Sequence, residues 1–418
     1  MEQPDASPSP ADRPLPGGAI TPQDWAARAD EAARSVTRVF GQRLFFLPGT
    51  HLAATVRPTG RLGTLSRPWH YWWQAHYLDC LVDTGRRELG LAGRALAAFD
   101  GGARPNAGRL ASRLLTGIWL RNFFTFVNNY YDDMAWLALS TLRLEKLAEE
   151  SGRPIPRRHA RIRRRLTLQF DSASTADLGG GTFWSTKRDF KNTPATAPVA
   201  LYYARTGNPD KAQALLDWLD AKLFDAGRGL YLDGLRIGPG GETKLENAVY
   251  TYNQGPVLGA LLALGGARNL ERAAVVVDAV AGHLTVTGTG VGTDSGYVLR
   301  CDGTGDGGLF TGILTRYLAL AARDGRLSGA NRSTAARLVT DTAEALWSGR
   351  RSVAPDEALA RHGGAERLVF SYDPQREASD AYPPGAAVEL STQLQAWTVL
   401  EAAAAVTAPG QPVTPGHA

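Results

Sequence analysis

Apolar side chains recur three and four positions apart along almost the whole chain, which is the spacing of one face of an α-helix. This periodicity predicts helices over residues 23–44, 69–88, 107–124, 132–151, 156–173, 194–207, 209–223, 247–264, 267–285, 306–323, 329–348 and 388–406. Short extended runs between them predict small hairpins on loops and no core sheet: residues 229–233, 243–245, 297–300 and 367–370. The pattern therefore predicts an all-α protein.

Every second predicted helix opens with aromatic, amide, acidic or glycine residues. His70, Asp132, Pro194, Tyr252, Asp306 and Glu389 mark these openings, which follow one another after 62, 62, 58, 54 and 83 residues. Each helical hairpin needs neighbours to bury its apolar face. Six hairpins in this order predict an (α/α)6 toroid, in which the inner helices point the same way and the polar openings meet at one mouth. An open helical solenoid is the alternative.

Composition and charge narrow the function classes. The 418 residues are 44% hydrophobic and 21% charged, which is typical of a globular protein. The net charge of +5, from 46 basic and 41 acidic residues, is too small to indicate a nucleic-acid partner. No apolar run is long enough to predict a transmembrane segment. Cys80 and Cys301 are too few for a disulfide framework, and free thiols are favoured for both.

The two ends of the chain differ in composition from the rest. Residues 1–22 and 407–418 are rich in Pro, Ser and Gly and are predicted to be disordered tails around one folded domain, residues 23–406. The first residues lack the basic start, apolar stretch and cleavage site of a secretory signal, so a cytoplasmic location is expected, or an extracellular one if a leader has been removed from this sequence. The seven His residues have no metal-binding spacing, so no metal is expected.

Two adjacent carboxylates, Asp132 and Asp133, open an otherwise apolar predicted helix. One interpretation is that they cap the helix and favour its positive end. The other is a catalytic pair for glycoside cleavage, in which one acid is ionised and the other holds a proton. Helix amides favour ionisation of the first acid, and its charge then raises the pKa of the second. The flanking aromatic and Asn residues favour the catalytic interpretation.

Four segments in order resemble glycoside hydrolase family 76, the endo-α-1,6-mannanases. They are Tyr130-Tyr131-Asp132-Asp133-Met134-Ala135-Trp136, the glycine-rich run over residues 179–192, Tyr252-Asn253-Gln254-Gly255, and the segment over residues 306–312. The resemblance spans residues 24–406. One departure is Phe183-Trp184, where family members often have two Trp residues.

The resemblance implies an (α/α)6 barrel that hydrolyses α-1,6-linked mannose chains with retention. Asp132 would be the nucleophile and Asp133 the general acid/base, without metal or organic cofactor. The expected partner is a mannose-containing polysaccharide or oligosaccharide, and the expected state is a monomer. Residues 23–406 would then be the catalytic domain.

Further residues at the predicted mouth could bind sugar rings or hydroxyls, although a core or loop-stabilising role is open for them. These candidates are Trp73, Asn129, Tyr131, Trp184, Lys187, Asn192, Tyr252, Asn253, Gln254, Asp306 and Phe310. Pro256 suggests that its helix begins near Gly255, which would leave Tyr252, Asn253 and Gln254 at the mouth.

Two other functions fit the same toroid. A sugar isomerase or epimerase would use paired His residues as acid and base, and only His70 and His76 are candidates. A non-catalytic glycan-binding or cell-wall scaffold protein would keep the aromatics without needing both carboxylates. The basic run over residues 157–165 is either a solvated helix face or a surface for an anionic lipoglycan or phospholipid.

Overall fold

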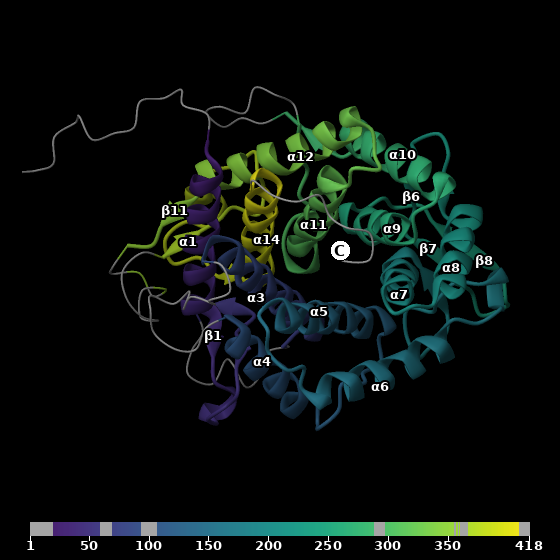
Figure 1. The fold of residues 1–418 in the computed structure, drawn as a ribbon, viewed down its shortest axis with the longest axis horizontal. Helices are drawn as coiled ribbons and strands as arrows, with labels where there is room; N and C mark the ends of the chain where they lie inside the picture. The colour runs from purple at the N-terminus through teal and green to yellow at the C-terminus, as the bar shows by residue number, and fades with distance from the viewer. Residues whose placement is uncertain are drawn as a thin grey trace, which may run out of the picture.

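The computed structural model describes residues 20–58, 69–92, 107–287, 297–354, 357, 359 and 367–408. The predicted tails, apart from Ile20–Pro22 and Thr407–Ala408, lie outside these residues. Within them, the chain forms a closed ring of helices in two layers (Figure 1), so the predicted all-α toroid is confirmed. No described helix combines the length and hydrophobicity needed to cross a bilayer.

Six inner helices line the axis of the ring. They are α3 (Tyr71–Ala92), α5 (Tyr131–Glu150), α7 (Thr193–Arg205), α9 (Thr251–Leu264), α11 (Phe310–Arg323) and α14 (Leu390–Thr407). Each packs against the next, and α14 packs against α3 to close the ring. In α14 every residue from Leu390 to Ala404 is buried. A helix without an exposed face needs neighbours on all sides, which the closed ring supplies.

Six outer helices return the chain between the inner ones. They are α1 (Pro22–Phe40), α4 (Ala107–Arg121), α6 (Arg157–Ala173), α8 (Pro209–Lys222), α10 (Ala267–His283) and α12 (Gly329–Ser348). Helix α1 shows how an outer helix packs with one face on the ring. A capping box between Thr21 and Asp24 starts it, and its apolar stripe, which includes Trp25, Ala29 and Val36, is buried.

Short strands join the helices, as the extended runs predict. The pairs are β1 (Gly41–Gln42) with β2 (Leu52–Ala53), β3 (Val56–Arg57) with β13 (Val388–Glu389), β5 (Phe224–Asp225) with β6 (Leu230–Tyr231), β9 (Thr285–Val286) with β10 (Val298–Leu299), and β11 (Arg351–Ser352) with β12 (Leu368–Val369). A three-stranded sheet has the order β4 (Phe190–Asn192), β7 (Gly234–Ile237), β8 (Thr243–Glu246). The four predicted extended runs overlap β6, β8, β10 and β12, and the other strands were not predicted. Among these, β4 links the glycine-rich run to the three-stranded sheet.

Two helix starts, those of α9 and α11, differ from the predicted starts by four residues, and the others by two or fewer. Helix α9 begins at Thr251, so the expectation that it begins near Gly255 is wrong, and Pro256 lies inside it. Gly255 packs closely there, since a Cβ on it would lie 2.9 Å from the Tyr317 ring. The tertiary packing of α9 on α11 thus outweighs the hydrogen bond that Pro256 cannot make. Residues Gly305–Leu309 form a 3-10 helix, η4, ahead of α11.

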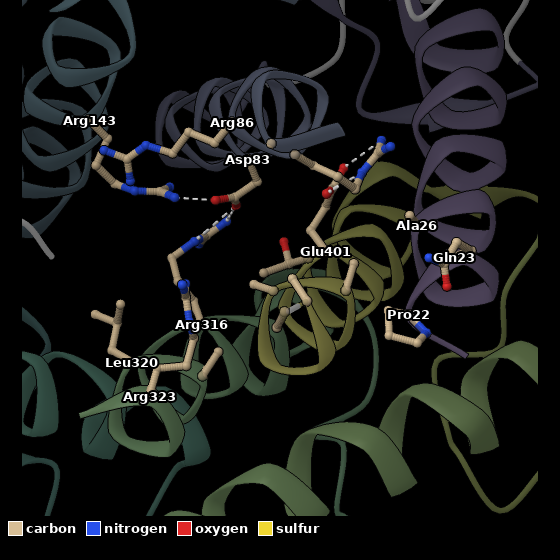
Figure 2. A pocket seen from close by; sticks show the side chains of 18 residues that line it. Pro22, Gln23, Ala26, Asp83, Arg86, Arg143, Arg316, Leu320, Arg323 and Glu401 are labelled. Carbon is tan, nitrogen blue, oxygen red and sulfur yellow. Dashed lines mark hydrogen bonds and ion pairs between the residues drawn. The ribbon is translucent and has the colours of Figure 1, made fainter. Parts of the chain in front are cut away.

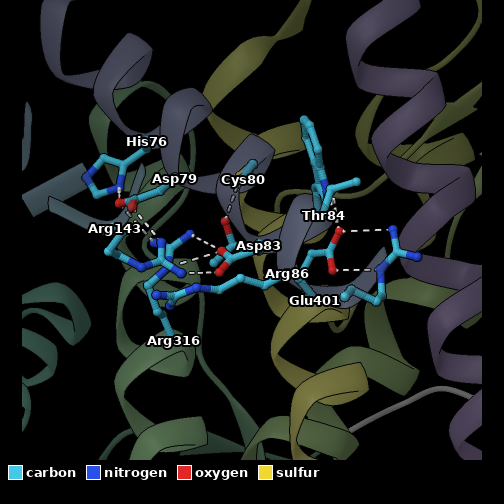
Figure 3. Close-up of polar contacts among 12 residues, drawn as sticks. His76, Asp79, Cys80, Asp83, Thr84, Arg86, Arg143, Arg316 and Glu401 are labelled. Atoms are coloured by element: carbon cyan, nitrogen blue, oxygen red, sulfur yellow. Dashed lines mark hydrogen bonds and ion pairs between the residues drawn. The ribbon is translucent and has the colours of Figure 1, made fainter. Parts of the chain in front are cut away.

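A buried charged network joins three inner helices below the mouth (Figure 3). Arg143 of α5 is ion-paired with Asp79 and Asp83 of α3, and Arg316 of α11 lies 2.9 Å from Asp83. His76 lies 3.8 Å from Asp79. Because these charges share partners inside the ring, they hold α3, α5 and α11 in one arrangement.

A cavity of about 410 Å³ lies at the other end of the inner helices (Figure 2). Asp83, Arg86, Arg143, Arg316 and Glu401 line it together with small residues of α1, α11 and α14. The charged residues belong to the middle and C-terminal parts of the inner helices, and Pro22, Gln23 and Ala26 to the start of the outer helix α1. The predicted site residues lie instead at or just before the N-terminal ends of the inner helices. The cavity is therefore separate from the mouth.

Candidate active site

The adjacent carboxylates Asp132 and Asp133 lie in the first turn of α5, at the mouth of the ring. Tyr130 occupies the position before the helix and provides no side-chain cap. Free backbone N–H groups of the first turn therefore face the carboxylates and favour negative charge there.

Asp132 is the more readily ionised member of the pair. Its Oδ2 accepts a hydrogen bond of 3.0 Å from the indole Nε1 of Trp184, and backbone N–H groups of the helix start also act on it. Burial raises the pKa of Asp132 to about 7, against these hydrogen bonds, which lower it. Its Oδ1 is buried without a hydrogen-bond partner. An oxygen that is desolvated and unpartnered is available to a reacting atom.

Asp133 keeps its proton to higher pH than Asp132 does. Its Oδ2 accepts a 2.7 Å hydrogen bond from Asn128 Nδ2. Burial, followed by the charge of neighbouring Asp132, raises the pKa of Asp133 well above its usual range. The pair therefore consists of one carboxylate that ionises first and one that keeps its proton, which is the division a glycoside-cleaving pair requires.

The glycine-rich run holds Trp184 against Asp132. The backbone of Trp184 makes two hydrogen bonds. Its oxygen accepts from Tyr131 N at 2.8 Å, and its nitrogen donates to Phe190 O at 2.8 Å. Buried Lys191 organises the run, since its Nζ donates to the carbonyl oxygens of Thr175, Asp177, Gly180 and Gly181 at 2.8–3.1 Å. The loop is thus built around one ammonium group.

A third carboxylate, Asp306, lies near the pair and is held by α3. Its Oδ1 accepts hydrogen bonds from the indoles of Trp72 at 3.1 Å and Trp73 at 2.9 Å. His70 stacks on Trp73 with ring centroids 4.1 Å apart. The charge of Asp306 raises the pKa of both Asp132 and Asp133. Asp306 thus connects the starts of α3 and α11 at the mouth.

An aromatic wall and a fourth carboxylate complete the mouth. Tyr252 of α9 stacks on Phe310 of α11 with centroids 3.8 Å apart. Burial raises the pKa of Tyr252 well above its usual range, and the charges of Asp233 and Asp132 raise it further. Asp233 follows β6, and burial raises its pKa to about 6. Asn253 donates to it at 3.4 Å. Flat apolar rings beside carboxylates suit a sugar, which has both apolar faces and hydroxyls.

Several predicted binding residues have other roles, and these expectations need correction. Asn192 is the N-cap of α7 and accepts from Ala195 N. Gln254 is fully buried and pairs with both backbone groups of Tyr231. Tyr131 is buried in the core, and so is Trp73, whose N–H donates to Asp306. These polar and aromatic side chains satisfy the fold's own groups, so they are not open to substrate.

Two further candidates are exposed without a contact to the pair. Lys187 is exposed, and its backbone N–H donates to Ser185 Oγ. Asn129 is also exposed, and its carbonyl accepts from Thr186. Nearby residues with the same side chains hold the site instead: Asn128 donates to Asp133, and Lys191 organises the glycine-rich run. Binding of a sugar by Lys187 or Asn129 stays a prediction.

The sequence analysis did not select four residues of the mouth: Trp72, Asn128, Tyr250, whose ring centroid lies 5.6 Å from that of Phe310, and Asp233. The first three lie in segments that it singled out, one or two positions from a chosen candidate. Asp233 ends an extended run and lies 100 residues from Asp133, so no sequence spacing connects them. Only the packing of β6 beside α9 brings Asp233 to Asn253.

The two His candidates for isomerase chemistry are not a pair. His70 lies at the mouth beside Asp306, at 3.9 Å. His76 is buried between Trp72 and Trp136, and burial lowers its pKa to about 3. A buried imidazole that stays neutral cannot alternate with His70 as acid and base. Among the described residues, no group of His, Cys, Asp and Glu is arranged to hold a metal ion.

Comparisons with known proteins found a matching family model and several similar structures. A family model described as Glycosyl hydrolase family 76 matches residues 50–362. The GH76A α-1,6-mannanase from Salegentibacter sp. HEL1_6 is 26% identical, with a TM-score of 0.71 over 92% of this chain and 100% of that one. An inactive variant of that enzyme, solved with α-1,6-mannotriose, matches with the same values. The Lin0763 protein from Listeria innocua, 21% identical with a TM-score of 0.69 over 91% of this chain and 97% of that one, shares the fold. No match was found among curated proteins.

Proposed function

The chain belongs to glycosyl hydrolase family 76 and is a glycoside hydrolase, and from this premise we propose that it is a retaining endo-α-1,6-mannanase. The observation that supports the proposal most is the unequal carboxylate pair, Asp132 and Asp133, at the start of α5. A glycan-binding scaffold has no need for two desolvated acids with different proton affinities.

In the first step, the ionised Asp132 attacks C1 of a bound mannose unit. Asp133 donates its proton to the glycosidic oxygen as the C1–O bond breaks. A mannosyl ester on Asp132 forms, the shortened chain leaves with a new hydroxyl, and Asp133 becomes ionised. The Trp184 hydrogen bond keeps the Asp132 carboxylate aimed and ionised for this step.

In the second step, water replaces the leaving chain. Asp133 takes a proton from the water, whose oxygen attacks C1, and the ester bond to Asp132 breaks. Both carboxyl groups return to their starting states. Two inversions at C1 leave the product with the α-configuration of the substrate.

The substrate class is supported by the mouth and by the relatives. The Tyr252–Phe310 stack and the ring of Trp184 offer apolar faces for mannose rings, and Asp306 and Asp233 offer acceptors for hydroxyls. The similar Salegentibacter enzyme is an α-1,6-mannanase. We therefore propose linear α-1,6-linked mannose as the chain that is cleaved. We also propose that the enzyme is a monomer, which size-exclusion chromatography tests.

A time course on linear α-1,6-mannooligosaccharides tests the proposal. Product size is followed by chromatography and the first-formed anomer by NMR, with Asp132→Asn and Asp133→Asn beside the wild type. We expect internal cleavage to α-anomers, and loss of at least a thousandfold in rate in both variants. Absence of products from the wild-type enzyme would refute the substrate assignment. First-formed β-anomers would refute retention.

Azide distinguishes the two carboxylates. In an Asp132→Gly variant with an activated aryl α-mannoside, azide occupies the position of the lost nucleophile, so the expected product is the β-mannosyl azide. In an Asp133→Gly variant the ester still forms, and azide then gives the α-mannosyl azide. Exchange of these two outcomes would reverse the assigned roles. Equal glycan binding by wild type and Asp132→Asn, with turnover by neither, would favour the scaffold alternative.

A further inference from the structure

The outer surface around α4 and α6 is unlike the rest of the molecule. Three segments form it: residues 43–53, 107–124 and 153–168. Together they contain eleven Arg residues and no Asp or Glu, whereas the other residues contain 35 basic and 41 acidic side chains. These segments, which we call the arginine sector, therefore carry +11 and the other residues −6. Two carboxylates adjoin the sector: Glu145 of α5 pairs with Arg163 at 3.0 Å, and Asp171 follows on α6.

The three segments are contiguous in the structure. His51 N donates to Arg113 O of α4, and a Cβ on Gly117 of α4 would lie 2.0 Å from the His51 carbonyl oxygen. Arg158 of α6 donates to Ser112 and Thr116 of α4. The hairpin from β1, helix α4 and helix α6 thus follow one another along the lower rim of the ring (Figure 1).

Exposed apolar side chains gather in the same sector. Of the eleven large apolar residues that are exposed in the described chain, eight belong to it: Phe45, Phe46, Leu47, Trp119, Phe123, Phe124, Ile155 and Leu168. Phe46 is 90% exposed and Phe123 is 84% exposed. Side chains of this size are seldom left in water in clusters without a partner.

The phenylalanines are presented by well-formed turns. Phe45, Phe46, Phe123 and Phe124 have φ values of 46°, 62°, 53° and 62°, a left-handed conformation that residues with a side chain rarely adopt. Asn122 fixes the second turn by donating to the carbonyls of Thr125 and Val127. The strain is therefore held in place by hydrogen bonds, and it directs the rings into solvent.

We propose that the arginine sector docks on an anionic phospholipid bilayer. Arginines on the outer face of α6 would contact lipid headgroups, and the phenylalanines would enter the acyl boundary, as interfacial anchors do. The apolar set includes Leu47, Ile155 and Leu168, which have no aromatic face for base stacking. Hydrocarbon accepts such aliphatic side chains and nucleic acid does not, so a lipid surface fits the sector better.

The exposed positions allow a direct test. Arg157, Arg161, Arg164 and Arg165 are all exposed on α6, and none belongs to the mouth. A variant with all four changed to Gln should fold as the wild type does. The control variant changes Lys244, Arg268, Arg332 and Arg337, on the other side of the ring, to Gln, and removes the same number of charges.

The assay is cosedimentation of the full chain with vesicles of phosphatidylcholine alone or mixed with phosphatidylglycerol. We expect binding only to the mixed vesicles, weakened by salt, and at least tenfold weaker in the α6 variant, since each basic residue near such a surface adds about fivefold. The control variant should bind within about twofold of the wild type. Phe46→Ser should reduce the binding that remains at high salt, whereas Leu245→Ser, an exposed apolar control, should not.

Three results would overturn the proposal. They are no preference for phosphatidylglycerol, equal losses in the α6 and control variants, and binding to a single-stranded oligonucleotide without binding to vesicles. Hydrolysis of soluble mannooligosaccharides by the α6 variant is measured separately, so the docking proposal and the proposed catalytic function can fail independently.

Discussion

Replacing Trp184 by Phe tests how the mouth controls the ionisation of Asp132. The replacement keeps a ring that can pack against Tyr130, whose centroid lies 4.9 Å from that of Trp184. It removes the indole N–H that donates to Asp132 Oδ2 at 3.0 Å. This hydrogen bond favours the ionised form and lowers the pKa of Asp132, so its loss raises that pKa.

The size of the shift follows from the kind of bond. A hydrogen bond to a charged group contributes about 1.5–3 kcal/mol, and one pKa unit corresponds to about 1.4 kcal/mol. The pKa of Asp132, about 7 in the wild type, should therefore rise by about one to two units. Asp132 must be ionised to attack, so activity is lost as pH falls through its pKa. The acid limb of the pH profile moves to higher pH by the same amount.

The assay is the pH dependence of kcat/KM on a soluble α-1,6-mannooligosaccharide, which reports the free enzyme. The rate deficit of Trp184→Phe should be largest at low pH and shrink as pH rises. Trp218→Phe is the matched control, because its indole also donates at 3.0 Å, but to the carbonyl of Leu178. An acid limb that stays in place in Trp184→Phe, or that moves equally in the control, would refute the reasoning.

Two further predictions concern buried cations that stabilise the fold around the site. Lys191→Met leaves several buried carbonyl oxygens without a donor, so it should lower the free energy of unfolding by about 3 kcal/mol or more. The control is Lys187→Met at an exposed position, which should change the free energy of unfolding by less than about 0.5 kcal/mol. Arg143→Met leaves Asp79 and Asp83 short of a cation and should cost about 3–5 kcal/mol. Urea unfolding measures both, and a loss under about 1 kcal/mol in either would contradict the assigned role.

Much of the fold could be predicted from local pattern. Helical spacing and the repeated polar openings indicated six hairpins, and each hairpin needs neighbours to bury its apolar face, which favoured a ring. The prediction failed where tertiary packing outweighed a local rule. Pro256 lies inside α9, because the close approach of Gly255 to Tyr317 keeps that helix continuous.

The candidate site was predictable only in part. Segments rich in aromatic and amide residues marked the mouth, but the choice of residue within a segment depended on partners far along the chain. Gln254 pairs with the backbone of Tyr231, and Asn192 caps its own helix. A polar side chain at a mouth has the same appearance in sequence whether it faces a substrate or a buried carbonyl.

The sequence by itself determined the all-α ring, the position of Asp132 and Asp133 at a helix start, and the resemblance that identifies the family. These features depend on residues close together in the chain, through helical spacing and helix capping. Only the tertiary structure decided that Trp184, Asp306 and Asp233 surround the pair. It also decided that two phenylalanine turns share a surface with the arginines of α6. Such contacts join residues far apart in sequence, and the closure of the ring determines which of them meet.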